Sequence, residues 1–348
     1  MNYKTPGVYV EELEKFPPSV AQVETAIPAF IGYTAKGPKN KPTRISSMLE
    51  YEMLFGEAKP EDFLIDVSGD SVTGYSIEAI VAPSPFKMYY AMQMYFANGG
   101  GPCYIVSAGI ENNYYSTVKS SELIEGLDTL KKEDEPTLIV FPDAEALGSN
   151  ANVLYNYALK HARDLKDRFV ILDVIYEGNW KVEVEEFRGA LNNGEHLKYG
   201  AAYFPKLETV LSYNYDEATI MVEDIALDDL KISNSELYNK VKKAIESTPV
   251  VLAPSSTMAG IYAKVDSTSG VFKAPANVGL NYVVAPTVKI SHKDQENLNV
   301  DTTAGKSINA IRAFTGKGTL VWGARTLDGN SNEWRYISVR RFFNMVEE

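Results

Sequence analysis

The sequence predicts an α/β protein in which helices flank a mainly parallel sheet. Two observations support this prediction: unbroken apolar runs such as 137–141 and 169–175, and intervening stretches whose apolar side chains recur at helical spacing. A strand of a parallel sheet is buried on both faces, so it shows no polar alternation. A chain of 348 residues, 45% of them hydrophobic, is long enough for about two domains or for one core with an insertion.

The first third begins this pattern. Its predicted elements are a strand at 26–34, a helix at 46–55, a helix at 86–96 and a strand at 103–106. Ser46 or Ser47 supplies the N-cap of the first helix, and Gly56 lies past its end. Gly99–Gly101 follow a helix and precede a strand, so we interpret them as a helix stop and not as a phosphate loop. Residues 57–85 are expected to form a variable insertion or loop.

The middle of the chain shows the clearest alternation of helices and strands. Its predicted helices lie at 122–130, 150–165, 182–191 and 235–246, and its predicted strands at 137–141, 169–175, 199–204 and 249–253. We expect these strands to build an α/β domain around 120–255, with residues 206–234 as an excursion from it.

The last third is expected to be rich in turns and β-hairpins. The turn-rich stretches are 260–263, 270–277 and 289–299. Strands at 318–327 and 334–339, joined by a turn at Asp328–Asn330, predict a hairpin. We expect core or hairpin-supporting roles for Trp322, Arg325, Trp334 and Arg340, and helical spacing follows in Val339, Phe342, Phe343 and Val346.

Residues 1–15 are predicted to form an extended N-terminal arm. Val8–Glu12 alternate as a strand does, and five residues cannot bury themselves alone. They must therefore add to a sheet edge, either in their own subunit or in another one. Phe16–Ser19 contain two prolines and form a stiff, extended link.

Few residues of the sequence could form the active site of an enzyme. Asp143 and Asp173 lie near the carboxyl ends of predicted strands, where α/β proteins place their sites, and Ser255–Thr257 follow another strand. The sequence has no Gly-x-Ser-x-Gly turn and no identifiable base for the serine, so a plain loop is the better interpretation. We predict no catalytic residue, while an α/β hydrolase acting through these residues stays an alternative.

The sequence also predicts neither a metal site nor a cofactor. His161 is expected at the surface or on the flank of its helix, and His196 and His292 in solvated turns. The three have no metal-binding spacing, and Cys103 is the single cysteine. Gly305–Ser307 lack the earlier glycine of a phosphate loop and are interpreted as a turn. A net charge of −12 disfavours binding to nucleic acid and to anionic membranes. No signal peptide or membrane-spanning run is visible.

Several motifs in order resemble a known family. They are Tyr3–Glu12, Thr34–Pro38, Phe96–Gly100, Ala259–Ala263, Gly270–Asn277, Ile308–Arg312, Val321–Leu327 and Trp334–Arg341. Together they resemble the sheath proteins of contractile phage tails and of related contractile injection systems. The resemblance runs from residue 3 to residue 348 and is weakest at 57–85 and 206–234.

The resemblance implies a structural function and no enzyme. Subunits of this family polymerise as stacked hexameric rings around an inner tube and contract to drive the tube through a target membrane. The implied partners are copies of the chain itself, the inner tube protein, and baseplate and terminator proteins, with no nucleic acid and no direct membrane insertion. The subunit would assemble in the cytoplasm of the producing cell and then belong to a phage tail or to an extracellular or cell-attached contractile particle.

The resemblance also assigns a linker and a domain division. The inter-subunit linker strand would consist of Thr5, Pro6, Gly7, Val8, Tyr9, Val10, Glu11 and Glu12. Residues 1–24 would form the linker arm, 25–56 and 86–348 the sheath core, and 57–85 a variable insertion or loop. The family continues past the helix at Arg340–Arg341, so we expect this chain to be a truncated or trimmed form. A baseplate or terminator component that shares the core is a further alternative.

Overall fold

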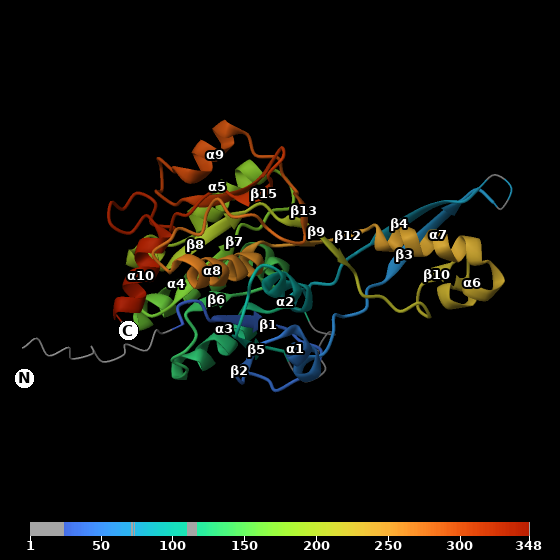
Figure 1. The fold of residues 1–348 in the computed structure, drawn as a ribbon, viewed down its shortest axis with the longest axis horizontal. Helices are drawn as coiled ribbons and strands as arrows, with labels where there is room; N and C mark the ends of the chain where they lie inside the picture. Colours follow the sequence, from blue (N-terminus) through green and yellow to red (C-terminus); the bar gives the residue numbers. More distant parts are fainter. Residues whose placement is uncertain (1–23, 71, 73, 110–116, 348) are drawn as a thin grey trace, which may run out of the picture.

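The computed structural model describes residues 24–70, 72, 74–109 and 117–347. These residues form an α/β body from which a smaller lobe projects (Figure 1). The body contains the large sheet and most of the helices, whereas the lobe contains a β-hairpin and two helices.

An eight-stranded sheet runs through the body. In spatial order its strands are β15 (Gly318–Val321), β14 (Ile308–Phe314), β8 (Gly200–Phe204), β7 (Phe169–Asp173), β6 (Leu138–Val140), β1 (Pro28–Gly32), β5 (Cys103–Ser107) and β2 (Thr43–Ile45). The six central strands are parallel, and the two edge strands are antiparallel to their neighbours. All residues of β1, β5, β6, β7 and β8 are buried, which explains their unbroken apolar runs. The predicted, mainly parallel sheet is confirmed.

Helices cover both faces of this sheet. One face carries α3 (Ser120–Thr129), α4 (Ala151–Leu165), α5 (Trp180–Ala190) and α9 (His292–Asn299). The other face carries α1 (Met48–Phe55), α2 (Met88–Ala97), α8 (Ser255–Ser269) and α10 (Ile337–Glu347). The predicted cap of the first helix is confirmed, because the Ser47 side chain accepts a hydrogen bond from the Glu50 backbone N–H.

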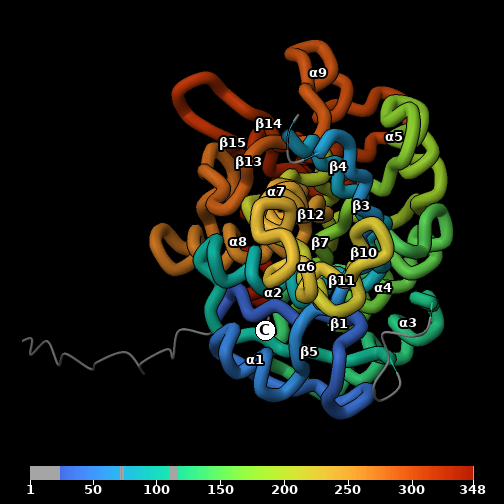
Figure 2. Tube along the Cα trace, turned by 90° about the vertical axis from the view of Figure 1, so that its right-hand side faces the viewer, coloured from blue at the N-terminus to red at the C-terminus, as the bar shows by residue number. Residues whose placement is uncertain are grey.

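The lobe has its own apolar core. It contains the hairpin of β3 (Phe63–Ser68) and β4 (Ser76–Val81), the short pair β10 (Met221–Val222) and β11 (Ile225–Ala226), and the helices α6 (Leu227–Ser233) and α7 (Ser235–Glu246). A three-stranded antiparallel sheet of β12 (Pro249–Leu252), β9 (Leu207–Ser212) and β13 (Val283–Pro286) lies at its base. Tyr90 and Met94 of α2 reach into this core. Figure 2 views the molecule from the lobe side, with α7 and α6 in front of the body.

The structure changes three sequence predictions in the first two thirds. Residues 63–68 and 76–81, in the segment expected to be an insertion or loop, pair as a regular hairpin whose inward side chains Phe63 and Ile65 are buried. The predicted strand at 249–253 exists but pairs with β9, and β14 takes the place beside β8. The large sheet therefore draws strands from well outside 120–255.

Two predictions for the last third are wrong. Residues 255–269 form the helix α8 rather than a loop and turns. Because most of this helix is buried, its sequence lacks the polar stripe that would indicate helical periodicity. The expected hairpin of 318–327 with 334–339 is absent from the described chain, since β15 pairs with β14 and Ile337 begins α10. An isolated bridge between Arg325 and Tyr336 remains between the two segments. The helical spacing predicted after Val339 is confirmed.

Neither a membrane-crossing helix nor a metal-binding cluster occurs among the described residues. Within these ranges, no helix is both long enough and apolar enough to cross a bilayer. The same residues bring together no group of three or more His, Cys, Asp or Glu side chains that could hold a metal ion.

Candidate functional site

The predicted linker strand, Thr5–Glu12, lies outside the described residues, so its assignment stays a prediction. The described residues begin at Glu24, which follows residues 1–23 in the sequence. The contacts that fix this junction are the features of the structure closest to the predicted linker, and we build the candidate site from them.

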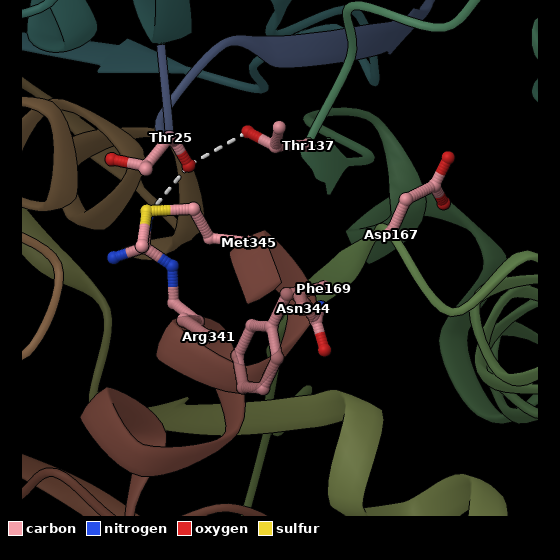
Figure 3. A pocket seen from close by; sticks show the side chains of 7 residues that line it. All are labelled: Thr25, Thr137, Asp167, Phe169, Arg341, Asn344 and Met345. Atoms are coloured by element: carbon pink, nitrogen blue, oxygen red, sulfur yellow. Dashed lines mark hydrogen bonds between the residues drawn. The ribbon is translucent and has the colours of Figure 1, made fainter. Parts of the chain in front are cut away.

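Thr25 is fixed between the last helix and the sheet (Figure 3). Its backbone oxygen accepts hydrogen bonds from Arg341 Nη2 and from Thr137 Oγ1, both at 2.9 Å. Its hydroxyl donates to Asp266 Oδ2 at 2.6 Å, and Thr137 Oγ1 accepts from the Ile27 N–H at 3.0 Å. We call Thr25, Thr137, Asp266 and Arg341 the terminal latch, because they join the beginning of the described chain to its last helix.

The centre of the terminal latch is a buried ion pair. Arg341 and Asp266 have side-chain exposures of 3% and 7%, and their two contacts measure 3.0 Å and 2.5 Å. The guanidinium also lies 4.8 Å from the centre of the Tyr262 ring, whose hydroxyl is 2.7 Å from that of Tyr203. A bidentate pair with a stacked ring holds both partners in one geometry, so the latch is rigid.

A second buried arginine fixes the same helix. Arg340 is 1% exposed, lies 2.9 Å from Glu347 Oε1 and donates to Asn344 Oδ1 at 2.7 Å. Its guanidinium stacks 4.4 Å from the Trp334 ring and 4.9 Å from the Tyr199 ring. Arg340 and Trp334 are therefore core-supporting residues, as predicted.

Trp322 and Arg325 belong to the same prediction but differ in environment. Trp322 is 40% exposed, so it is a surface residue rather than a core residue, and it stacks on Phe314 at 4.6 Å. Arg325 donates to the Asn299 carbonyl at 3.3 Å, and its backbone N–H donates to Asn309 Oδ1 at 2.7 Å. It thus supports the chain after β15, although not within a hairpin.

Sequence reasoning missed most of the terminal latch. Arg341 belongs to a quoted motif, but neither Asp266 nor Thr25 was singled out. One signal was present: a buried arginine needs a carboxylate, and Asp266 stands four residues after Tyr262, on the same helix face.

The two aspartates of the enzyme alternative cap helices. Asp143 accepts from the backbone N–H groups of Tyr33 and Lys87, both at 2.6 Å, and so joins the end of β1 to the start of α2. Asp173 accepts from the Ser255 N–H at 2.8 Å, at the start of α8. A carboxylate at a helix N-terminus satisfies free N–H groups and complements the helix dipole.

This capping closes the place where an α/β protein usually binds its ligand. The strand order reverses beside β1, and such switch points hold the ligand crevice. Here a Cβ on Gly32 would come within 2.5 Å of Asp143 Oδ2, so the carboxylate fills the space against the strand end. Asp143, Asp173 and Ser255 are 0%, 4% and 1% exposed, which leaves a substrate no access to them.

The same two carboxyls predict a pH dependence of stability. Burial raises the pKa of Asp143 to about 6 and that of Asp173 to about 7, against about 4 in an unfolded chain. Between these values the native chain binds more protons than the unfolded chain, so its stability falls as the pH rises. We expect the free energy of unfolding to fall by about 4 kcal/mol from about pH 5 to about pH 8, with Asp173 contributing the larger part. Urea unfolding measures this, and Asp173→Asn should flatten the profile; a wild-type profile as flat as that of the variant would contradict it.

Two of the three histidine predictions are wrong. His161 and His196 are each 4% exposed, whereas His292 lies at the surface as expected. Burial and the nearby Arg168 lower the pKa of His161 to about 4, and burial also lowers the pKa of His196. Both histidines are buried, His161 in α4 and His196 just before β8.

Gly305–Ser307 do not form a phosphate loop. Lys306 is 2% exposed and donates to the backbone oxygens of Arg188, at 2.6 Å, and of Leu191. Its ammonium therefore satisfies the free carbonyls at the end of α5, and the prediction of a structural turn is supported.

The lobe concentrates the negative charge of the chain. Residues 57–84 and 213–248 contain fourteen acidic and five basic residues, a net charge of −9 out of −12 for the whole chain. On the outer face of the hairpin, Asp66 stands directly opposite Glu78, next to the exposed pair Leu64 and Ile80. Like charges in directly opposed strand positions repel each other.

This opposed pair gives a simple prediction. Glu78→Gln is expected to raise the free energy of unfolding by about 0.2–1 kcal/mol at low salt. The gain should shrink as salt screens the repulsion. Chemical unfolding at two salt concentrations measures the effect, and a loss of stability at low salt would contradict it.

Known proteins of similar structure indicate the class of protein that this chain resembles. No model of a protein family matches the sequence, and no curated protein matches it. Solved structures do match, and they define a class: sheath proteins of contractile injection systems, which are structural proteins and not enzymes.

Three of these solved structures show the extent of the similarity. A chain of an extracellular contractile injection system, the PVC sheath complex in its contracted state, is 26% identical with a TM-score of 0.62, over 100% of this chain and 73% of its own. A chain of the anti-feeding prophage baseplate, six-fold symmetrised, is 28% identical with a TM-score of 0.61, over 99% and 74%. A chain of the same baseplate in the contracted state is 25% identical with a TM-score of 0.67, over 99% and 76%. The resemblance inferred from the sequence motifs is therefore confirmed.

Proposed function

We propose that this chain is the sheath subunit of a contractile particle. It polymerises as stacked hexameric rings around an inner tube and contracts to drive that tube through a target membrane. The single observation that supports this most directly is the similarity to the contracted PVC sheath over the whole chain. Its further partners in this proposal are baseplate and terminator proteins, and it assembles in the cytoplasm of the producing cell before joining a phage tail or an extracellular or cell-attached particle.

The terminal latch gives residues 1–23 a fixed point of attachment. In the proposal, Thr5–Glu12 add as a strand to a sheet of a neighbouring subunit, where backbone hydrogen bonds hold them and Val8 and Val10 set the register. A load on this linker passes to Thr25 and from there to both α8 and α10 through Asp266 and Arg341. The subunit can then change its packing without losing its neighbour.

Contraction requires two packings of the same subunits, the extended one being metastable. In the proposal assembly itself stores the energy, and the lobe contributes to it because its net charge of −9 makes neighbouring lobes repel each other. Contraction that is insensitive to ionic strength would contradict this electrostatic contribution of the lobe.

We also propose that the lobe segment 57–85 is a variable insertion in a core formed by 25–56 and 86–348.

A second candidate is a baseplate component that shares the sheath core. Two of the similar chains come from structures of the anti-feeding prophage baseplate, which favours this alternative specifically. Such a component would end or begin a polymer rather than extend it. No feature of the described residues favours the α/β hydrolase alternative, because Asp143, Asp173 and Ser255 are buried and a substrate cannot reach them.

Sedimentation velocity over a range of protein concentrations distinguishes the two candidates. A sheath subunit should form open-ended species whose size grows with concentration, because head-to-tail contacts repeat without closing. A baseplate component should stop at one closed ring of fixed size. A chain that stays monomeric at every concentration would contradict both for the protein used.

A further inference from the structure

The last helix of the described residues, α10, has the reverse of the usual amphipathic pattern. Its side toward the body carries the buried arginines Arg340 and Arg341. Its opposite side consists of apolar side chains that are open to solvent: Phe342 (37% exposed), Phe343 (41%) and Val346 (59%). A surface helix normally turns its apolar side inward, so an apolar side that faces outward indicates a surface that another segment covers.

The exposed side of α10 belongs to an aromatic surface. The Phe343 ring lies 5.2 Å from the ring of Trp334 and 5.9 Å from that of Phe342, and both pairs are edge to face. Grooves lined by aromatic rings are the surfaces on which proline-rich segments dock in the polyproline conformation. We call Trp334, Phe342, Phe343 and Val346 the aromatic face.

The described residues begin beside this aromatic face. Thr25 accepts a hydrogen bond from Arg341, and Thr25 and Met345 line the same small pocket (Figure 3). Phe342 lies three residues before Met345, so the two side chains are neighbours on the helix surface. The aromatic face therefore starts next to Thr25, and eight extended residues before Glu24, about 26 Å of chain, are long enough to cross it.

The segment that precedes Glu24 has the chemistry that this face requires. Residues 16–23, which lie outside the described residues, have the sequence Phe-Pro-Pro-Ser-Val-Ala-Gln-Val and no charged residue, in a chain that is 23% charged. Adjacent prolines favour the polyproline conformation, which loses little entropy on binding. Length, position and composition together select this segment as the occupant of the face.

We propose that residues 16–23 dock on the aromatic face of α10 in the same chain. Pro17 and Pro18 pack against the rings of Phe342 and Phe343, and docking removes apolar surface from water. The docked segment fixes the direction in which residues 1–15 leave the body, and deletion of residues 1–15 leaves it in place. This inference concerns contacts within one chain and does not depend on the proposed function.

Disulfide cross-linking in the chain of residues 1–348 tests this docking. Cys103, the single native cysteine, is buried and does not take part. Ser19→Cys is combined with Val346→Cys on the aromatic face or, as the matched control, with Ser267→Cys, an exposed position of α8 beside Thr25. Under mild oxidation the Val346→Cys pair should cross-link about ten-fold faster than the control pair, because an undocked tether would sample both positions.

Three further variants identify the contact. Phe342→Ser should slow the cross-link of the Val346→Cys pair to the rate of the control pair, and so should Pro17→Gly combined with Pro18→Gly. Leu64→Ser removes an exposed apolar side chain from the lobe hairpin and should leave the rate unchanged.

Three results would overturn the proposal. They are equal rates for the two cysteine pairs, equal effects of Phe342→Ser and Leu64→Ser, and cross-links that join two copies even at the lowest protein concentration. In the last case a second copy of the chain would occupy the aromatic face. Each of these results leaves the proposed polymer untouched, because polymerisation is measured separately by sedimentation.

Discussion

Replacing Arg341 by methionine is expected to destabilise the chain by about 3–5 kcal/mol, because Asp266 then stays buried without its partner. The variant also loses the hydrogen bond to the Thr25 carbonyl and the contact with the Tyr262 ring. Urea unfolding should show a lower midpoint with an unchanged slope, since the surface exposed on unfolding stays the same.

Two further variants show whether the buried ion pair causes this loss. Arg341→Met combined with Asp266→Leu removes both charges and should recover most of the stability, since an apolar pair can replace a buried ion pair. Arg312→Met removes an arginine that stacks on Phe314 outside the latch and should change stability by less than about 0.5 kcal/mol. If Arg341→Met were as mild as Arg312→Met, the terminal latch would not stabilise the fold.

Asp143→Ala is expected to cost about 2–5 kcal/mol. It leaves the N–H groups of Tyr33 and Lys87 without an acceptor, and each buried unsatisfied group costs about 1–3 kcal/mol. Differential scanning calorimetry with parallel chemical unfolding measures the loss. Asp143→Asn keeps one acceptor oxygen and should be milder, whereas Asp164→Ala changes only an exposed pair with Arg163 and serves as the control. A loss no larger than that of Asp164→Ala would show that the caps contribute nothing.

Much of the fold could be predicted because local patterns agree with the tertiary structure. The strands at 137–141 and 169–175 were visible because both of their faces are buried, and Ser47 marked its helix through a local cap. The helix α8 was missed for the opposite reason: buried on most sides, it shows no amphipathic period. The pairing of β14 with β8 joins Ile308 to Ala202, a contact across more than a hundred residues that no local spacing encodes.

The candidate site was less predictable because its partners are distant in sequence. Arg341 and Thr25 are 316 residues apart, and Asp266 and Thr25 are 241 apart. The sequence indicated that a buried arginine would need a carboxylate, but only the packing of α8 against α10 selects Asp266 among 46 acidic residues. The same limit applies to Asp143, which the hydrolase alternative named for its position at a strand end and which is a helix cap in the structure.

Negative-stain electron microscopy of the chain at rising concentration, with and without residues 1–15, tests the central claim most directly. The account predicts hollow helical tubes for the chain that retains residues 1–15 and their loss on deletion of the arm, while the thermal stability of the body stays unchanged because the terminal latch begins at Thr25. Tubes that persist without residues 1–15 would contradict the linker assignment. Single particles of one size in both samples, at every concentration, would contradict the sheath function of this chain.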